Sequence, residues 1–283
     1  MSADSLHIKA VILDLDGVIY RGRTPVPGAA ETTRWLGSNG YQTYYFTNNS
    51  TRSRDSYVEM LAGFGITSDP DHVVTSASLT AQYFQDNGLL PATALVVGEG
   101  GLAEELRRAG VRVVRTRGQR EIGYVVVGMD RKFTYRKLHE AQQAVLAGAK
   151  LIATNRDATY PVEEGNVIPG GGSIVAAVAT ACEREPLLIG KPSPKAGELI
   201  VRHAGVRPNE ALIVGDRLET DILTGRRAGL RTCLVLTGIS TKEEAEAAPE
   251  EMRPDFIIES IAGLPGLLEG MEAGRAPAPP EKG

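Results

Sequence analysis

The chain has 283 residues, of which 42% are hydrophobic and 23% are charged, as is typical of a globular enzyme. Its net charge of −4 provides no basic surface, so we expect no nucleic-acid partner. No apolar run approaches the roughly 20 residues that a membrane span needs, and the N-terminus does not resemble a signal peptide. We therefore expect a cytoplasmic protein without membrane contact. Cys182 and Cys233 lie in apolar runs and are predicted to be buried, reduced thiols.

Short apolar runs alternate with amphipathic segments along the chain. We expect strands, covered on both faces, at residues 10–14, 42–46, 94–97, 124–127, 151–153, 211–215 and 231–236. Residues 53–65, 101–110 and 134–148 are predicted to be helices that end near glycine, with Thr134 capping the third. This βαβ alternation predicts an α/β fold with a doubly wound parallel sheet. Residues 272–283 are small, charged and proline-rich, which favours a disordered tail.

Polar side chains follow four strand-like runs at the point where each run ends. They are Asp14 and Asp16; Thr47, Asn48 and Asn49; Lys191; and Asp216, Arg217, Thr220 and Asp221. Successive strand side chains point to opposite faces, so Asp14 and Asp16 leave the strand on the same side. In a parallel sheet, the carboxyl ends of the strands form one edge, and ligands bind there. We therefore expect the four clusters to converge. Each cluster on its own could equally be a solvated turn or a helix cap rather than part of a ligand site.

Carboxylates from several strands cannot share a site without a cation. Oxygen ligands favour Mg²⁺ over zinc, which prefers His or Cys. Lys191 and the cation would attract a dianionic phosphate, while Thr47 and the backbone amides after it would bind the phosphate oxygens. One of the first two aspartates would then be a nucleophile toward phosphorus, and the other a proton donor and acceptor beside it.

The spacing of these clusters indicates an inserted domain. Thr47 and Lys191 are 144 residues apart, far more than one βα connection requires. We predict a core formed by residues 1–79 and 187–265, and a smaller α/β cap at 80–186 that covers the site and contacts the leaving group. Its candidate contacts are Asn155, Arg156 and Asp157, and Arg131 is a weaker candidate; either arginine could pair with a carboxylate on the leaving group. Residues 170–173 (GGGS) lack the ending of a phosphate loop and are predicted to turn the chain back to the core.

The segments DLDGVIY, TNNS, GKPSP and GDRLETDI resemble the four motifs of the haloacid dehalogenase superfamily. The chain is most similar to subclass IIA, the group of NagD, p-nitrophenyl phosphatase and phosphoglycolate phosphatase, which carries a large α/β cap between the second and third motifs. The resemblance extends from about residue 8 to residue 262 and includes the cap phrases VVGEGG, GMDRKFTY and ATNRDATYP.

This resemblance implies a role for each motif residue. Asp14 would be the nucleophile and Asp16 the general acid and base. The phosphoryl group would be held by Thr47 and Lys191, with Asn48 and Asn49 beside it. Mg²⁺ would be bound by Asp14, the backbone carbonyl of Asp16, and Asp216, with Asp221 in support, and the loop from Arg217 to Thr220 would surround the site.

The expected function is hydrolysis of a small phosphorylated metabolite by a Mg²⁺-dependent phosphatase, through an aspartyl-phosphate intermediate. A phosphomutase, which protects that intermediate from water, is an alternative. A receiver-like phospho-acceptor switch is a second alternative, although receivers have about half the length of this chain and no large insertion. The sequence leaves open a homodimer and the choice among phosphoglycolate, glycerol phosphate, pyridoxal phosphate, nucleotides and sugar phosphates.

Overall fold

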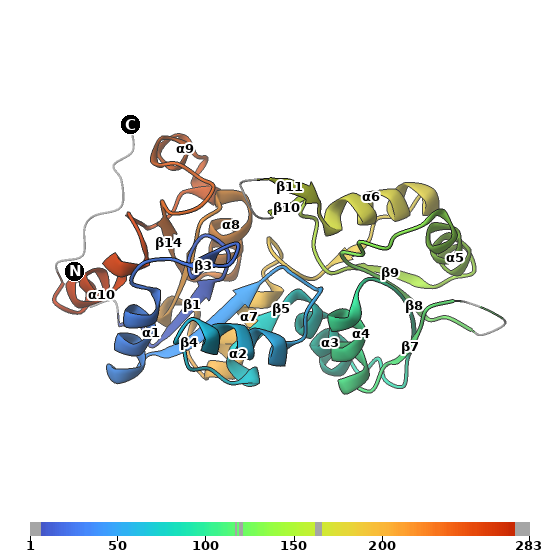
Figure 1. The fold of residues 1–283 in the computed structure, drawn as a ribbon, viewed down its shortest axis with the longest axis horizontal. Helices are drawn as coiled ribbons and strands as arrows, with labels where there is room; N and C mark the ends of the chain where they lie inside the picture. The colour runs from blue at the N-terminus through green and yellow to red at the C-terminus, as the bar shows by residue number, and fades with distance from the viewer. Residues whose placement is uncertain (1–6, 117, 119–120, 162–165, 275–283) are drawn as a thin grey trace. The chain divides into compact units, whose positions relative to one another are not determined.

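A computed structural model of the chain describes residues 7–116, 118, 121–161 and 166–274 (Figure 1). The chain divides into two compact units. The core unit comprises Met1–Thr47, Val58–Val73 and Lys191–Gly283, and the cap unit comprises Asn48–Tyr57 and Val74–Gly190. The cap unit is thus inserted into the core unit. It includes residues 48–57, 74–79 and 187–190, which the sequence-based boundaries at 79 and 187 assigned to the core.

The core unit is built on a six-stranded sheet with the order β15-β14-β13-β1-β4-β5. The strands are β1 (Ala10–Asp14), β4 (Gln42–Thr47), β5 (Val73–Thr75), β13 (Ala211–Gly215), β14 (Arg231–Val235) and β15 (Phe256–Ile258). Parallel pairing joins β1 to both β4 and β13, β13 to β14, and β14 to β15. The chain proceeds from β1 toward β4 on one side and from β13 toward β15 on the other. The predicted doubly wound sheet is confirmed, and its switch point lies between β1 and β13.

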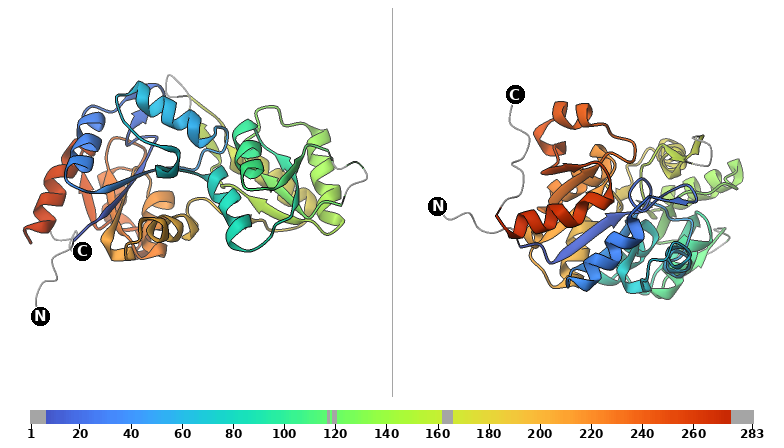
Figure 2. Two further views of the ribbon diagram at one scale, coloured as in Figure 1. Left: turned by 90° about the horizontal axis from the view of Figure 1, so that it is seen from below. Right: turned by 60° about the vertical axis from the view of Figure 1, so that its left-hand side comes forward.

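Helices cover the core sheet, so all five residues of β1 are buried (Figure 2). These helices are α1 (Ala29–Ser38), α2 (Arg54–Gly63), α7 (Lys195–Ala204), α8 (Leu223–Ala228), α9 (Lys242–Ala247) and α10 (Leu264–Glu272). The first residues of α2 belong to the cap unit. Helix α1 packs beside α10, and α7 packs beside α8. Shorter elements are β2 (Tyr20–Arg21), β3 (Thr24–Pro25), η1 (Pro70–His72), η3 (Pro208–Glu210), η4 (Leu218–Ile222), η5 (Glu250–Met252) and η6 (Ile261–Gly263).

The cap unit has its own five-stranded parallel sheet, with the order β12-β9-β8-β6-β7. Its strands are β6 (Thr93–Val97), β7 (Arg112–Val114), β8 (Tyr124–Val127), β9 (Lys150–Ala153) and β12 (Leu187–Leu188). Its helices are α3 (Ser76–Asp86), α4 (Gly100–Arg108), α5 (Tyr135–Leu146) and α6 (Gly171–Cys182), and β10 (Thr159–Pro161) pairs with β11 (Val167–Pro169). Helices α5 and α6 pack on one face of the sheet over Val125, Val127 and Ala153, and α3 and α4 lie on the other face (Figure 1).

All seven predicted strands and all three predicted helices are present. Thr134 caps α5 as expected, because its side chain accepts a hydrogen bond from the Lys137 amide at 3.3 Å. Cys182 and Cys233 are buried free thiols, as predicted.

Two local predictions need correction. Residues 170–173 do not turn the chain back to the core; they begin α6 inside the cap unit. Glycine is needed there because a Cβ at Gly172 would lie 2.2 Å from the Arg156 carbonyl oxygen. Glu272, where the tail was expected to start, is the last residue of α10, whose apolar face buries Leu264, Leu268 and Met271. Residues 275–283 of the expected tail lie outside the described part of the chain.

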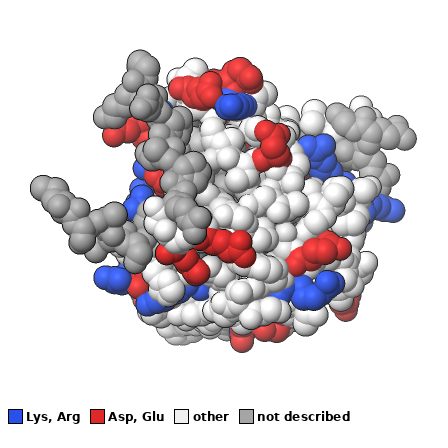
Figure 3. Space-filling model, turned by 90° about the vertical axis from the view of Figure 1, so that its left-hand side faces the viewer, with Lys and Arg blue, Asp and Glu red and all other residues white. Residues whose placement is uncertain are grey.

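The surface shows no strong segregation of charge on the face drawn in Figure 3. Acidic and basic side chains both occur there, around an area without charged side chains. Among the described residues, no helix combines the length and the apolar character needed to cross a bilayer.

Candidate active site

The central strands place three of the predicted site residues at one edge of the core sheet. Asp14 is the last residue of β1, Thr47 is the last residue of β4, and Asp216 directly follows β13. Strand β1 pairs with both neighbours in a register that sets Asp14 opposite Phe46 and Leu13 opposite Val214. All three polar residues are buried. Three of the residues expected to converge therefore lie at the carboxyl ends of neighbouring strands in the core unit.

Lys191 lies among these carboxylates. Its Nζ donates hydrogen bonds to Asp14 Oδ1 at 2.5 Å and to Asp221 Oδ1 at 2.6 Å, and it stands 4.6 Å from the centroid of the Phe46 ring. Burial opposes the charged form of the ammonium, but the two carboxylates outweigh burial and raise the Lys191 pKa above its ordinary value. Lys191 therefore carries a positive charge directly beside the predicted nucleophile.

Asp14, Asp216 and Asp221 form the one cluster of potential metal ligands found among the described residues. One carboxylate oxygen from each residue lies within 4.8 Å of those from the other two, and all three residues are buried. Burial raises the pKa of Asp14, and the neighbouring carboxylates add to this effect while Lys191 opposes it. Burial, together with the negative charge of Asp221, raises the pKa of Asp216 to about 7. When all three carboxyl groups are ionised, they and the one ammonium carry two negative charges in excess. That excess matches one divalent cation with oxygen ligands.

The backbone leaves room for these carboxylates by placing glycine against them. A Cβ at Gly17 would lie 2.6 Å from Asp216 Oδ2, a Cβ at Gly238 would lie 2.0 Å from the same oxygen, and a Cβ at Gly215 would lie 2.2 Å from the Asp221 Cβ. Gly17 also has a φ of 80°, which strongly favours glycine. The donor set and the space around it thus fit a magnesium ion.

Residues 237–240, after β14, also belong to this site, and the sequence reasoning missed them. Thr237 Oγ1 donates to the Gly17 carbonyl at 2.6 Å, and the Ile239 amide donates to Asp216 Oδ2 at 2.9 Å. The Ser240 amide donates to the Asp216 carbonyl, also at 2.9 Å. The segment TGIS carries no ionisable side chain. Its only signal was its position at the end of another buried parallel strand.

Asp16 differs from the other predicted metal ligands. Its side chain is partly exposed, it accepts a hydrogen bond from the Tyr20 hydroxyl at 3.4 Å, and it does not belong to the three-carboxylate cluster. The structure thus separates the environment of Asp16 from that of Asp14, although they are two residues apart. A half-exposed carboxyl group suits exchange of protons with substrate and water. Metal binding by the Asp16 backbone carbonyl stays a prediction.

Arg217 and Thr220 both contact Asp221. The Arg217 amide donates to Asp221 Oδ2 at 3.1 Å, and Thr220 Oγ1 donates to the same oxygen at 3.4 Å. Asp221 lies in η4, a π-helical turn of the kind that often occurs at functional sites. The loop therefore orients Asp221, while phosphate binding by Arg217 and Thr220 stays a prediction.

Four predicted substrate contacts belong to the cap unit: Asn48, Asn49, Asn155 and Asp157. Asn155 is 3% exposed, and its Nδ2 donates to the Asn48 carbonyl at 2.8 Å. The Asn48 side chain donates to Asp157 Oδ1 at 3.1 Å, and the Asn49 side chain donates to the Tyr160 hydroxyl at 3.1 Å. The structure thus brings Asn48, Asn155 and Asp157 into one cluster, in which Asn48 and Asn155 are buried and Asp157 is partly exposed. Their contact with a leaving group stays a prediction.

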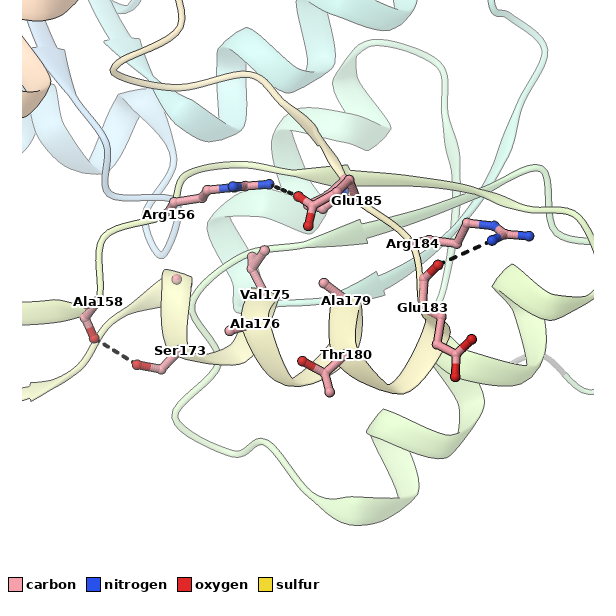
Figure 4. A pocket seen from close by; sticks show the side chains of 12 residues that line it. Arg156, Ala158, Ser173, Val175, Ala176, Ala179, Thr180, Glu183, Arg184 and Glu185 are labelled. Atoms are coloured by element: carbon pink, nitrogen blue, oxygen red, sulfur yellow. Dashed lines mark hydrogen bonds and ion pairs between the residues drawn. The ribbon is translucent and has the colours of Figure 1, made fainter.

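The cap unit also contains a cavity of about 770 Å³ along α6 (Figure 4). Its walls combine apolar residues of α6 with the ion pair between Arg156 and Glu185, whose side chains meet at 2.5 Å. Neither Asn155 nor Asp157 lines this cavity. Arg131 is likewise engaged, through two hydrogen bonds of 2.7 Å from its guanidinium to Glu99. Both arginines that could recognise an anionic leaving group are therefore already paired.

Comparison with known proteins agrees with this geometry. A family model described as haloacid dehalogenase-like hydrolase matches residues 11–112, and a second, HAD-hydrolase-like model matches residues 188–264. Glycerol-3-phosphate phosphatase from Gallus gallus is 36% identical over 93% of this chain and 93% of its own length. The chain belongs to the haloacid dehalogenase-like hydrolases.

Solved structures of similar proteins support the same assignment. A glycerol phosphate phosphatase from Mycobacterium tuberculosis in complex with magnesium matches with a TM-score of 0.84 and 36% identity, over 93% of this chain and 80% of that one. A p-nitrophenyl phosphatase from Archaeoglobus fulgidus matches with a TM-score of 0.83 and 35% identity, over 91% and 98% of the two chains. These relatives are thus named as phosphatases, and they share the fold of this chain.

Proposed function

We propose that this member of the family is a Mg²⁺-dependent phosphatase that hydrolyses small phosphate monoesters through an aspartyl phosphate on Asp14. One observation carries the proposal: the Asp14 carboxylate ends the central strand, 2.5 Å from the Lys191 ammonium, within a buried cluster of three aspartates. Such a cluster holds a nucleophile, a counter-charge and a cation site together. The activities named for the similar proteins support the same reaction class.

In the first step, an Asp14 oxygen attacks phosphorus and the ester oxygen departs. The Lys191 ammonium favours the ionised form of the buried Asp14 carboxyl group, and in that form the carboxylate needs no base to act as a nucleophile. Lys191 neutralises charge on the phosphoryl oxygens, and the Thr47 hydroxyl donates a hydrogen bond to one of them. A bound magnesium ion, held by Asp14, Asp216 and Asp221 and by the carbonyl of Asp16, would supply further neutralisation of this charge.

Asp16 moves the protons in both steps. It gives its proton to the departing ester oxygen, and the resulting carboxylate then removes a proton from the attacking water. Water attacks phosphorus, the bond to Asp14 breaks, and inorganic phosphate leaves with Asp14 restored as a carboxylate. The partial exposure of Asp16 gives both leaving group and water access to its carboxyl group.

We further propose that the substrate is a small metabolite with a neutral, hydroxyl-bearing leaving group. Arg131 and Arg156 are the predicted cap cations for a carboxylate such as phosphoglycolate, and in the structure they form ion pairs with Glu99 and Glu185. The glycerol phosphate named for two of the relatives is an ester of the neutral kind. A cytoplasmic location, the absence of a nucleic-acid partner and the choice between monomer and homodimer remain predictions from composition.

The test is turnover of p-nitrophenyl phosphate, glycerol phosphate and phosphoglycolate by the purified protein with Mg²⁺. We expect hydrolysis of the first two without a sugar bisphosphate activator. Activity that depends on such an activator would instead indicate a mutase. A single phosphorylation of Asp14 without release of phosphate would indicate a receiver-like switch. Preference for phosphoglycolate over glycerol phosphate would contradict the proposed leaving-group class.

A further inference from the structure

Two of the four peptide bonds that join the cap unit to the core unit lead directly to proposed catalytic residues. Asn48 of the cap unit is preceded by Thr47, and Gly190 of the cap unit is followed by Lys191. Consecutive Cα atoms are about 3.8 Å apart across a trans peptide, so the backbone position of a residue limits that of its neighbour. Whatever fixes Asn48 and Gly190 therefore also restricts the phosphate-binding residues.

Asn48 is fixed from three directions inside the cap unit. Its carbonyl accepts hydrogen bonds from Ser76 Oγ at 2.5 Å and from Asn155 Nδ2 at 2.8 Å. Its side-chain amide donates to Asp157 Oδ1 at 3.1 Å. The carboxylate of Asp157 offers only acceptors to that amide, so Asn48 Nδ2 faces Asp157.

The other side of the Asn48 amide faces Gly190. A Cβ on Gly190 would lie 2.6 Å from Asn48 Oδ1 and 2.4 Å from the Thr154 carbonyl oxygen, so only glycine fits there without displacement. The Gly190 amide donates to that same Thr154 oxygen at 2.8 Å. The two chain segments that carry Thr47 and Lys191 thus start from adjoining points, Asn48 and Gly190, which are held by the side chains and backbone around Asn155.

Asn155 and Asp157 tie this cluster to the cap sheet. Asn155 follows β9 by two residues, its Oδ1 accepts the Asp157 amide at 3.1 Å, and it is 3% exposed. Each polar group of the Asn155 side chain therefore has a partner within the cap unit. A side chain that is buried and bonded in this way suits a structural support better than recognition of a varied ligand.

We propose that Asn155 and Asp157 are positioning residues for the phosphoryl site, which fix the backbone that leads into Thr47 and Lys191 and do not select the leaving group. The inference rests on the proposed phosphatase function. Because every ester presents the same phosphoryl group, loss of this support should lower kcat/KM by a similar factor for all substrates. A displacement of about 1 Å in reacting groups can cost on the order of a hundredfold in rate.

The experiment compares Asn155→Ala, Asp157→Ala and Asp157→Asn with the wild type on p-nitrophenyl phosphate, glycerol phosphate and a sugar phosphate. We expect kcat/KM of both alanine variants to fall by about tenfold or more, by a similar factor on each ester, and the inhibition constant of inorganic phosphate to rise. Asp157→Asn keeps an oxygen acceptor for Asn48 and should recover most of the activity. Gln142→Ala is the matched control, because it removes another side-chain amide that donates to a cap carbonyl, at 2.6 Å from Ala181.

Two outcomes of the kinetic comparison would overturn the inference. A defect confined to hydroxyl-bearing esters, with p-nitrophenyl phosphate unaffected, would assign both residues to the leaving group. A lower melting temperature with unchanged kcat/KM would make their role purely structural. Amide hydrogen exchange of residues 44–50 provides a readout that needs no turnover: Asn155→Ala should accelerate it and Gln142→Ala should not. A wild type that hydrolyses no ester would contradict the proposed function, whereas unchanged exchange would contradict the positioning role.

Discussion

At the scale of single residues, two aspartates two positions apart have different surroundings. Asp14 is buried beside Lys191, whereas Asp16 is partly exposed and bonded to Tyr20. We expect Asp14→Asn to abolish turnover while the protein stays folded, because the amide has nearly the same shape but is not an anionic nucleophile. Residual kcat above about a tenth of the wild-type value, or about 1.4 kcal/mol of barrier, would contradict this role. Asp71→Asn, at an exposed carboxylate of the core unit, is the control.

Asp16→Asn should have an effect that depends on the leaving group. p-Nitrophenolate departs without a proton, whereas the alkoxide of glycerol phosphate needs one, so the loss of kcat should be larger for glycerol phosphate. The ratio of the two losses, measured at saturating substrate, is the relevant quantity. Equal losses on both esters would mean that Asp16 acts through structure or metal binding rather than as an acid.

At the scale of elements, the ends of parallel strands create the site, and glycines allow close approach there. A Cβ at position 238, in the turn after β14, would lie 2.0 Å from Asp216 Oδ2, so Gly238→Ala must displace the carboxylate or the turn. We expect the Mg²⁺ concentration for half-maximal activity to rise at least about tenfold, which corresponds to a loss of roughly 1.4 kcal/mol of binding free energy.

A glycine without such contacts serves as the control for this substitution. Gly266 lies inside α10, and a Cβ there would meet nothing within 4 Å. Alanine loses less conformational freedom in a helix than glycine, so Gly266→Ala should leave the metal dependence unchanged and stabilise the protein by about 0.5–1 kcal/mol. If the two variants required the same Mg²⁺ concentration for half-maximal activity, the prediction that Gly238 supports metal binding would be wrong.

Elements that are buried on both faces could be predicted from the sequence, because burial alone determines their pattern of apolar residues. Strands such as β1 and β13 are covered on both faces, so they appear as uninterrupted apolar runs followed by polar residues. The turn at 237–240 escaped prediction because it contributes backbone amides and a hydroxyl, which carry no distinctive residue type. The partnership of Asn48 with Asn155 escaped as well, since it joins residues 107 positions apart and depends on the cap fold.

At the scale of the whole molecule, the core sheet assembles a cluster whose charge is unbalanced without a cation. Asp14, Asp216 and Asp221 face a single ammonium, so a divalent cation should stabilise the folded protein as well as permit turnover. A ligand that binds only the folded state at 100 times its Kd adds about 2.7 kcal/mol to the free energy of unfolding. We expect a chelator to abolish activity and to lower the melting temperature, and added Mg²⁺ to restore both. Full activity in excess chelator would remove the metal from the mechanism.

Calcium should separate binding from catalysis. Its bonds to oxygen are 2.3–2.6 Å, against 2.0–2.1 Å for magnesium, and its coordination shell is larger and looser. The same carboxylates can therefore hold Ca²⁺, but Asp14 and the phosphoryl group would be displaced from the geometry that attack requires. We expect Ca²⁺ to raise the melting temperature of the chelator-treated protein and to support little or no hydrolysis of p-nitrophenyl phosphate. Adding Ca²⁺ to the Mg²⁺-loaded enzyme should inhibit it competitively. Equal turnover with the two ions would show that the distance between Asp14 and phosphorus is not set by the metal.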